Sequence, residues 1–223
     1  MWPRRAQAIQ VKTPGQVAIM REAGLVVART LEVVAAAVRP GVTTAELDAL
    51  AEREIRAAGA TPSFLGYHGY PATICTSVND EIVHGIPSPA RRLNEGDIIS
   101  IDCGAIVRGW HGDAAVTVGV GAISAEHAAL LRTCEAALWQ GLAQARVGGR
   151  LGDISHAVEA SIRQAGPYGM VEEYRPGAVA GRACRCCRLR TRRRRTCPAA
   201  GSIRHGLGFG YKPGRHRIGR RAS

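Results

Sequence analysis

The segment from Gly96 to Gly121, GDIISIDCGAIVRGWHGDAAVTVGVG, constrains the fold of this chain more than any other. It is rich in β-branched and small apolar residues, and the dipeptide Arg108-Gly109 interrupts it near the middle. Two apolar runs separated by a short glycine-containing turn are typical of paired strands. The segment therefore predicts two strands joined around this dipeptide.

Segments with helical periodicity flank this hairpin on both sides. Residues 13–41 and 43–59 precede it, and each begins with a threonine three residues before a glutamine or glutamate, the pattern of a capping box. Residues 124–145 follow it, and a further helix is predicted from Asp153 to a stop at Gly166. Two helices, strands and two helices form the order of an internal repeat in an α+β protein. Residues 169–174, GMVEEY, could begin the second set of strands.

Charge is divided unevenly along the chain. The whole sequence carries a formal charge of +12. Residues 1–174 hold 15 basic residues and all 18 acidic ones, a charge of −3, whereas residues 175–223 hold 15 basic residues and no acid. The basic character therefore belongs to the last 49 residues, and the preceding part has the charge of an ordinary globular protein.

Cysteine usage and hydropathy indicate where such a protein would reside. Cys75, Cys103 and Cys134 are scattered through the first 174 residues, and the start, MWPRRAQAIQ, lacks the apolar core of a signal peptide. No run approaches 18 apolar residues. We expect a cytoplasmic protein with reduced cysteines, no membrane segment and a monomeric state.

Asp102 and Asp113 lie on the two predicted strands of the hairpin. On antiparallel strands such residues can point to the same side, and two neighbouring carboxylates repel each other unless a cation lies between them. Unrelated acids at strand ends or turns are the alternative interpretation. The surrounding sequences, IISIDCG and GDAAVTV, are apolar, and an unpaired carboxylate would be costly to bury there. They therefore favour two aspartates that bind a cation between them.

Two further segments carry polar side chains suited to a binding site. NDEIVHGIP places His84 at the end of a short predicted strand, where a histidine can donate a hydrogen bond to a developing oxyanion or can serve a structural role. SFLGYHGYPATIC supplies Tyr67, Tyr70 and Cys75, a mixture from which small apolar pockets are often built. An ordinary turn with packed tyrosines would explain the second segment equally well.

The motifs GYHGYPATICTSVNDEIVHGIP and GDIISIDCGAIVRGWHGDAAVTVGVG together resemble type I methionine aminopeptidases over residues 13–174. The tyrosine pair, the cysteine, the His-Gly-Ile-Pro sequence and both aspartate segments follow the order and spacing of that family. The resemblance implies a pita-bread fold, a pseudo-twofold αβ repeat around a curved antiparallel sheet. Residues 1–12 would be an N-terminal extension, residues 13–174 a partial catalytic domain, and residues 175–223 a basic Arg- and Cys-rich tail.

The resemblance also implies an activity and its cofactors. Members of the family are hydrolases that remove the initiator methionine from nascent proteins, so the substrate would be an N-terminal methionine presented close to the ribosome. They use two divalent metal ions, such as cobalt, manganese, iron or zinc, held by two Asp, one His and two Glu. The metals make hydroxide available near neutral pH. A proline-specific relative fits the GYHGYP motif and Cys75 less well.

Site residues follow from the resemblance position by position. Asp102 would bind one metal and Asp113 would bridge both. His84 would be the catalytic histidine and would contact the substrate beside the scissile amide. The pocket for the methionine side chain would be lined by Tyr67, Tyr70 and Cys75.

The resemblance ends near Tyr174. The family's third ligand is a histidine in a Gly-His-Gly-Ile-Gly segment, whereas the aligned position here is about Gly177 within RPGAVAGRAC. No Asp or Glu follows Glu173, and the last glutamate ligand would lie beyond Ser223. Because two aspartates alone cannot hold a dinuclear site, we expect an incomplete second half and impaired activity.

The tail contains the stretch CRCCRLRTRRRRTC, from Cys184 to Cys197. Acidic residues, hydrophobic periodicity and the family motifs all end together upstream of this stretch. The resulting composition resembles the translation of GC-rich coding DNA in the wrong reading frame. Our hypothesis is a frameshift near codon 174. Translation of the underlying DNA in the other two frames tests it, and the hypothesis fails if neither frame continues with the missing His and Glu segments.

The alternative is a functional tail on a non-catalytic pita-bread relative. Four consecutive arginines would hold RNA or ribosomes through nonspecific phosphate contacts. Specific RNA recognition is not favoured, because residues 175–197 contain no aromatic side chain for base stacking. Zinc binding is not favoured either, because the cysteines lack the paired spacing of zinc ligands.

Overall fold

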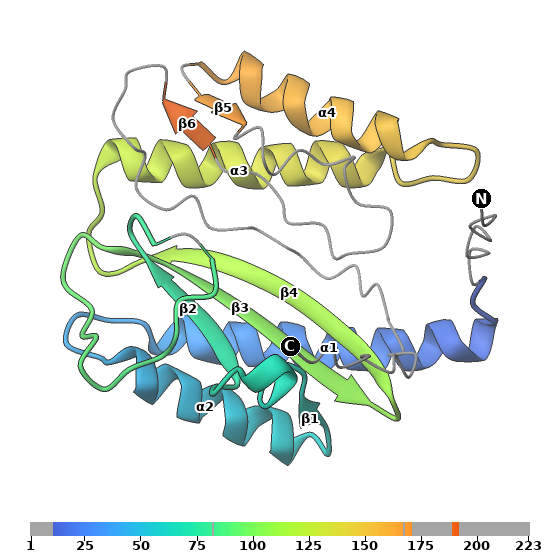
Figure 1. Ribbon diagram of the computed structural model, residues 1–223. Coiled ribbons are helices and arrows are strands. Elements are labelled where there is room, and N and C mark those ends of the chain that lie inside the picture. Colours follow the sequence, from blue (N-terminus) through green and yellow to red (C-terminus); the bar gives the residue numbers. More distant parts are fainter. Residues whose placement is uncertain (1–10, 82, 167, 171–188, 192–223) are drawn as a thin grey trace, which may run out of the picture.

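The computed structural model describes residues 11–81, 83–166, 168–170 and 189–191 (Figure 1). Two helices precede a sheet and two follow it, so the predicted α+β order is confirmed. The elements are α1 Pro14–Ala37, α2 Thr44–Ala57, β1 Thr61–Pro62, the short 3₁₀ helix η1 Tyr67–Gly69, β2 Ile74–Val78, β3 Ile98–Val107, β4 Trp110–Gly119, α3 Ala125–Ala143, α4 Leu151–Gln164, β5 Tyr168–Met170 and β6 Leu189–Thr191.

Capping boxes start the first two helices, as the sequence predicts. Thr13 Oγ1 accepts from the Gln16 amide at 3.3 Å, and Gln16 Oε1 accepts from the Thr13 amide at 2.9 Å. Thr43 and Glu46 repeat the arrangement at the start of α2, at 3.2 Å and 2.7 Å. These bonds satisfy amides that have no partner within the first turn of a helix.

The start of α4 differs from the sequence prediction. The helix begins at Leu151 rather than at Asp153. Asp153 occupies the third helical position, where its carboxylate accepts from the Arg150 amide at 2.8 Å. An acid in the first turn and an acid preceding the helix give similar sequence patterns, because both interact favourably with the exposed amides of a helix N-terminus.

The sheet is organised around β3. β4 pairs with β3 along its whole length, while β2 and β1 pair one after the other with the opposite edge, all antiparallel. The hairpin turn lies at Arg108 and Gly109, which have φ values of 47° and 81°. Two consecutive positive φ angles match the twist of a tight antiparallel hairpin, so the predicted turn is confirmed.

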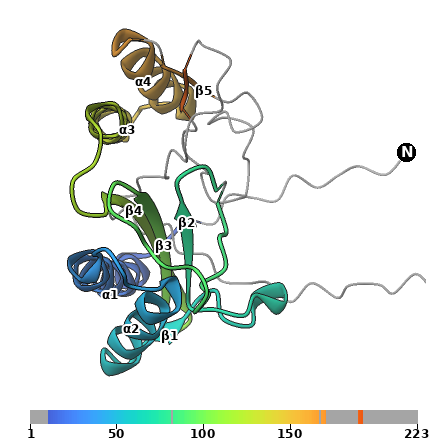
Figure 2. The same ribbon diagram turned by 90° about the vertical axis from the view of Figure 1, so that its left-hand side faces the viewer.

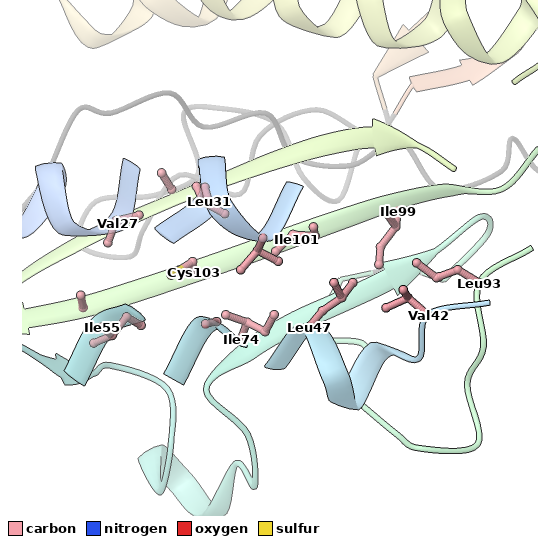
Figure 3. Packing of buried hydrophobic residues seen from close by; sticks show 14 of the residues in the cluster. Val27, Leu31, Val42, Leu47, Ile55, Ile74, Leu93, Ile99, Ile101 and Cys103 are labelled. Carbon is pink, nitrogen blue, oxygen red and sulfur yellow. The ribbon is translucent and has the colours of Figure 1, made fainter. Parts of the chain in front are cut away.

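One face of this sheet is covered by α1 and α2 (Figures 1 and 2). Alternate β3 residues, among them Ile99, Ile101 and Cys103, are fully buried on that face. They pack with Leu31 of α1 and Leu47 of α2 in a single apolar cluster (Figure 3). Burial of these side chains supplies the main driving force for the αβ unit.

The other face of the sheet is polar. Because side chains alternate along a strand, the residues between the core positions of β2, β3 and β4 point away from α1 and α2. They include a buried pair, Ser100 Oγ and Thr117 Oγ1, whose oxygen atoms lie 3.0 Å apart. We refer to this surface as the polar face; its members include Cys75, Ser77, Ser100, Asp102, His111, Asp113 and Thr117.

Helices α3 and α4 pack against each other around a second, smaller apolar cluster. The strand β5 follows α4 and pairs with β6, with Tyr168 opposite Thr191. Strand structure at residues 169–170 agrees with the prediction for GMVEEY, and residues 171–174 lie outside the described residues. No helix in the described ranges is long and apolar enough to cross a membrane.

The strand β6 differs from the sequence expectation for the tail. Leu189–Thr191 lies within the arginine- and cysteine-rich stretch, where no periodicity is visible in the sequence, yet it pairs with a strand of the preceding part. Three residues are too few for an alternating pattern to emerge. The other residues of that stretch lie outside the described ranges.

Candidate functional site

Asp102 and Asp113 lie on the polar face as diagonal neighbours. Asp102 is opposite Ala115, and Gly104 is opposite Asp113. Directly opposite residues point to the same side of a sheet, as do residues two apart on one strand, so both carboxylates share a face. The register set by the tight turn makes them diagonal rather than directly opposite. Both are partly exposed, although the Oδ1 atom of Asp102 is buried.

Two of the proposed pocket residues lie beside Asp102. Cys75 of β2 is the direct partner of Asp102 on the other edge of β3, and it is buried. Tyr70 lies close by: burial raises the pKa of its phenol, and a hydrogen bond with Cys75 and the charges of Asp48 and Asp102 raise it further. The structure therefore brings Tyr70, Cys75 and Asp102 together.

His84 lies outside regular structure, which corrects the prediction of a strand ending there. Its φ is 56°, in the left-handed region, and its side chain is exposed. The chain turns back after β2 so that the Thr76 amide donates to the Gly85 carbonyl at 2.8 Å. The β-branched residues of the segment suggested a strand, but a backbone that folds over β2 in this way leaves no extended ladder.

Tyr67 is more exposed than the other pocket candidates. The residue is 64% exposed, whereas Tyr70 is half-buried and Cys75 is buried. The ring of Tyr67 packs edge-on against His68 at a centroid distance of 4.3 Å. Tyr67 therefore lies mainly in solvent, and its backbone carbonyl accepts from the Tyr70 amide at 3.0 Å.

His111 also belongs to the polar face, although it is not among the site residues predicted from the sequence. It precedes Asp113 by two residues on β4, and its Nδ1 lies 3.1 Å from the Ser63 hydroxyl. Burial lowers the pKa of its imidazole, and the nearby carboxylate of Asp113 opposes this effect. The spacing of two in HGD, within a predicted strand, was the signal that could have placed both side chains on one face.

Asp48 connects α2 to the start of β2. Its Oδ1 accepts hydrogen bonds from the Thr73 and Ile74 amides, each at 2.9 Å. Burial raises the pKa of this carboxyl, and the two backbone bonds oppose the increase. The sequence gives no sign of this role, because the partners lie 25 and 26 residues away.

Replacement of Asp48 tests whether its charge or its acceptor oxygen matters. Asp48→Ala leaves two amides in a partly buried position without an acceptor, and we expect it to lower the free energy of unfolding by about 2 kcal/mol. Asp48→Asn keeps a carbonyl oxygen for both amides and should be much closer to the parent. Urea unfolding followed by circular dichroism measures both, and an equal loss in the two variants would show that the charge itself is required.

Comparison with known proteins identifies the family. The model of metallopeptidase family M24 matches residues 18–217, which is most of the chain and runs beyond Tyr174. The chain belongs to metallopeptidase family M24. It is 48% identical over 176 residues to methionine aminopeptidase 1 of Mycobacterium tuberculosis, covering 77% of this chain and 66% of that protein. It is 49% identical over 163 residues to methionine aminopeptidase 1 of Bacillus subtilis, covering 73% of this chain and 65% of that protein.

Solved structures agree with this family assignment. A methionine aminopeptidase from Thermotoga maritima matches with a TM-score of 0.71 and 34% identity, covering 74% of this chain and 66% of that structure. A prolidase from Pyrococcus furiosus matches at 18% identity with a TM-score of 0.61, which shows a common fold alone. The predicted pita-bread fold is thereby confirmed. The chain spans slightly less than two thirds of the length of the curated relatives above.

M24 members are metallopeptidases, so the donor atoms of the polar face can be compared with the needs of a metal. Asp102 and Asp113 offer hard carboxylate oxygens on one face, which suits a divalent cation. Within the described ranges, however, no group of three or more His, Cys, Asp or Glu is placed to hold a metal ion. These residues alone therefore do not fit a complete metal centre.

Proposed function

We propose that this M24 chain is built for the removal of N-terminal methionine from nascent proteins, as a cytoplasmic aminopeptidase. The observation that carries the proposal is the arrangement of Asp102, Asp113 and Cys75 on one polar face, within a segment 48% identical to a methionine aminopeptidase. Asp102 and Asp113 would be the ligands that this chain contributes to a site for two divalent metal ions. His84 would contact the substrate, and the side-chain pocket would be formed by Tyr67, Tyr70 and Cys75.

Activity of the 223-residue chain should nevertheless be impaired. Residues 175–223 contain no Asp or Glu, so they cannot supply the acidic ligands expected from the second half of the domain. Two carboxylates close together bind a divalent ion weakly, because most of its coordination positions remain with water. The residues present therefore indicate which reaction the site is built for, whereas the 223-residue chain lacks ligands that this reaction needs.

Hydrolysis of Met-Ala-Ser tests both parts of the proposal. The purified chain is assayed with added cobalt or manganese, beside a hybrid in which residues 175–223 are replaced by the part of the Mycobacterium tuberculosis relative that follows its matching segment. We expect little or no turnover by the chain and clear turnover by the hybrid. A folded hybrid that releases no methionine would contradict the proposed activity, and rapid turnover by the 223-residue chain would contradict the impairment.

The charge of the tail supports a second candidate, nonspecific binding to RNA or ribosomes. Residues 175–223 carry 15 basic residues and no acid, enough for several phosphate contacts. We expect binding to a single-stranded RNA that weakens steeply between 50 and 200 mM salt, as for proteins that neutralise several phosphates. RNA binding that survives deletion of residues 175–223 would show that the tail is not responsible.

A further inference from the structure

Gly85, the residue that follows His84, anchors the loop to β2 after Glu81 has already bonded to Val78 at the end of that strand. The Gly85 carbonyl accepts from the Thr76 amide at 2.8 Å and from the Tyr70 hydroxyl at 3.2 Å. The Gly85 amide donates to Ser77 Oγ at 3.2 Å. Three hydrogen bonds from two neighbouring segments therefore converge on the residue that follows His84.

The approach of this backbone to β2 is too close for any side chain. A Cβ atom at Gly85 would lie 2.0 Å from the Thr76 carbonyl oxygen and 2.8 Å from its carbonyl carbon. Both are backbone atoms of a strand paired with β3, so they cannot move aside as a flexible side chain would. Gly85 is thus a fixed point of the loop.

The residues before Gly85 adopt backbone conformations that need external support. His84 has a φ of 56° and Val83 a φ of 36°. The left-handed region is unfavourable for L-residues, most of all for a β-branched one such as valine, and it persists only where surrounding contacts impose it. The hydrogen bonds of Gly85 hold the end of this segment that follows His84.

Tyr70 contributes to this anchor from the pocket side. Its hydroxyl oxygen lies 2.9 Å from the Ile74 carbonyl oxygen and 3.2 Å from the Gly85 carbonyl oxygen. Carbonyl oxygens only accept and a phenol has one proton, so the two carbonyls share the single O–H donor of Tyr70. Burial raises the pKa of the Tyr70 phenol, so the hydroxyl retains its proton. The backbone amide of the same residue, Ile74, donates to the carboxylate of Asp48.

We infer that Tyr70 is a positioning residue for His84. Its hydroxyl ties the start of β2 to the Gly85 carbonyl and thereby places the preceding histidine, in addition to any contact of the Tyr70 ring with a bound side chain. The inference rests on the proposed function, which gives His84 its role. The bonds themselves are properties of the chain and do not require a metal or a substrate.

The substitution Tyr70→Phe isolates this role, because it removes the hydroxyl and keeps the ring. Tyr67→Phe is the matched control, since it makes the same change three residues away on an exposed side chain. Hydrogen exchange of the full 223-residue chain is followed at the Thr76 and Gly85 amides. The ring resonances of His84 are followed by NMR and assigned with a His84→Gln variant.

In Tyr70→Phe we expect both amides to exchange about three- to tenfold faster, the range expected from the loss of one net hydrogen bond. The His84 ring resonances should shift in Tyr70→Phe and remain unchanged in Tyr67→Phe. Ser77→Ala removes the acceptor of the Gly85 amide and should act in the same direction, whereas Ser100→Ala, on the same face, should not.

Three results would overturn the inference. The first is that amide exchange at Thr76 and Gly85 and the His84 ring resonances do not change in Tyr70→Phe. The second is that Tyr67→Phe changes them equally. The third is that the Thr76 and Gly85 amides are already unprotected against exchange in the parent chain. None of these readouts depends on peptide hydrolysis. A failure of the proposed activity can therefore be told apart from a failure of the positioning role.

Discussion

Replacement of Gly112 by alanine is expected to lower the free energy of unfolding by about 2 kcal/mol, since overpacking of this kind typically costs 1–3 kcal/mol. A Cβ atom at this position would lie 2.6 Å from the carbonyl carbon and oxygen of Ala23 and 2.7 Å from the Gly24 amide nitrogen. All three are backbone atoms of α1, so no side-chain rotation can relieve the overlap. The helix would have to move away from β4.

A glycine of α1 provides the matched control. Gly24→Ala introduces the same methyl group at a position where a Cβ atom would meet nothing within 4 Å. Alanine is favoured over glycine inside a helix by about 1 kcal/mol, so this variant should be more stable than the parent. Urea unfolding followed by circular dichroism measures both. Equal stability of Gly112→Ala and the parent would mean that α1 is not held against β4 as closely as the structure shows.

The close contact between Gly112 and α1 also affects the polar face. Gly112 points toward α1, and the next residue, Asp113, points to the opposite side of the same strand. A displacement of β4 from the helix would therefore also displace one of the two carboxylates. The absence of a side chain at Gly112 is thus linked to both the packing of the helix layer and the position of the candidate ligand.

Elements with strong local signals could be predicted from the sequence. The capping boxes at Thr13 and Thr43 involve residues three apart, and both are present as hydrogen bonds. The hairpin turn at Arg108-Gly109 likewise depends on neighbouring residues. The shared face of the two aspartates follows from strand periodicity once the hairpin is known, although the diagonal offset depends on a register that spacing alone does not define.

Features that depend on distant contacts could not be predicted in this way. Asp48 finds its amide partners 25 and 26 residues away, and the Tyr70 hydroxyl bonds to a carbonyl 15 residues further along the chain. The backbone at His84 is shaped by the anchor of Gly85 against β2, which overrides the β-propensity of the preceding residues. The strand β6 is defined only by its pairing with β5.

Asp113→Asn should have opposite effects on stability and on activity. In the 223-residue chain, Asp102 and Asp113 are like-charged diagonal neighbours on the polar face, so the loss of one charge should raise the free energy of unfolding by roughly 0.5 kcal/mol. In the active hybrid, the same change removes a proposed metal ligand. Turnover of Met-Ala-Ser should fall by more than about 100-fold, since even the loss of a residue that only supports a ligand costs 10- to 100-fold.

Glu135→Gln on α3 is the control, because it also removes one carboxylate but lies on an exposed helix position away from the polar face. It should change neither quantity appreciably. A less stable Asp113→Asn chain would indicate that the carboxylate serves the fold, and an active Asp113→Asn hybrid would remove Asp113 from the proposed ligands. A stability gain together with a loss of turnover would instead mean that the two acids are kept together at a cost to folding, which a bound cation would offset.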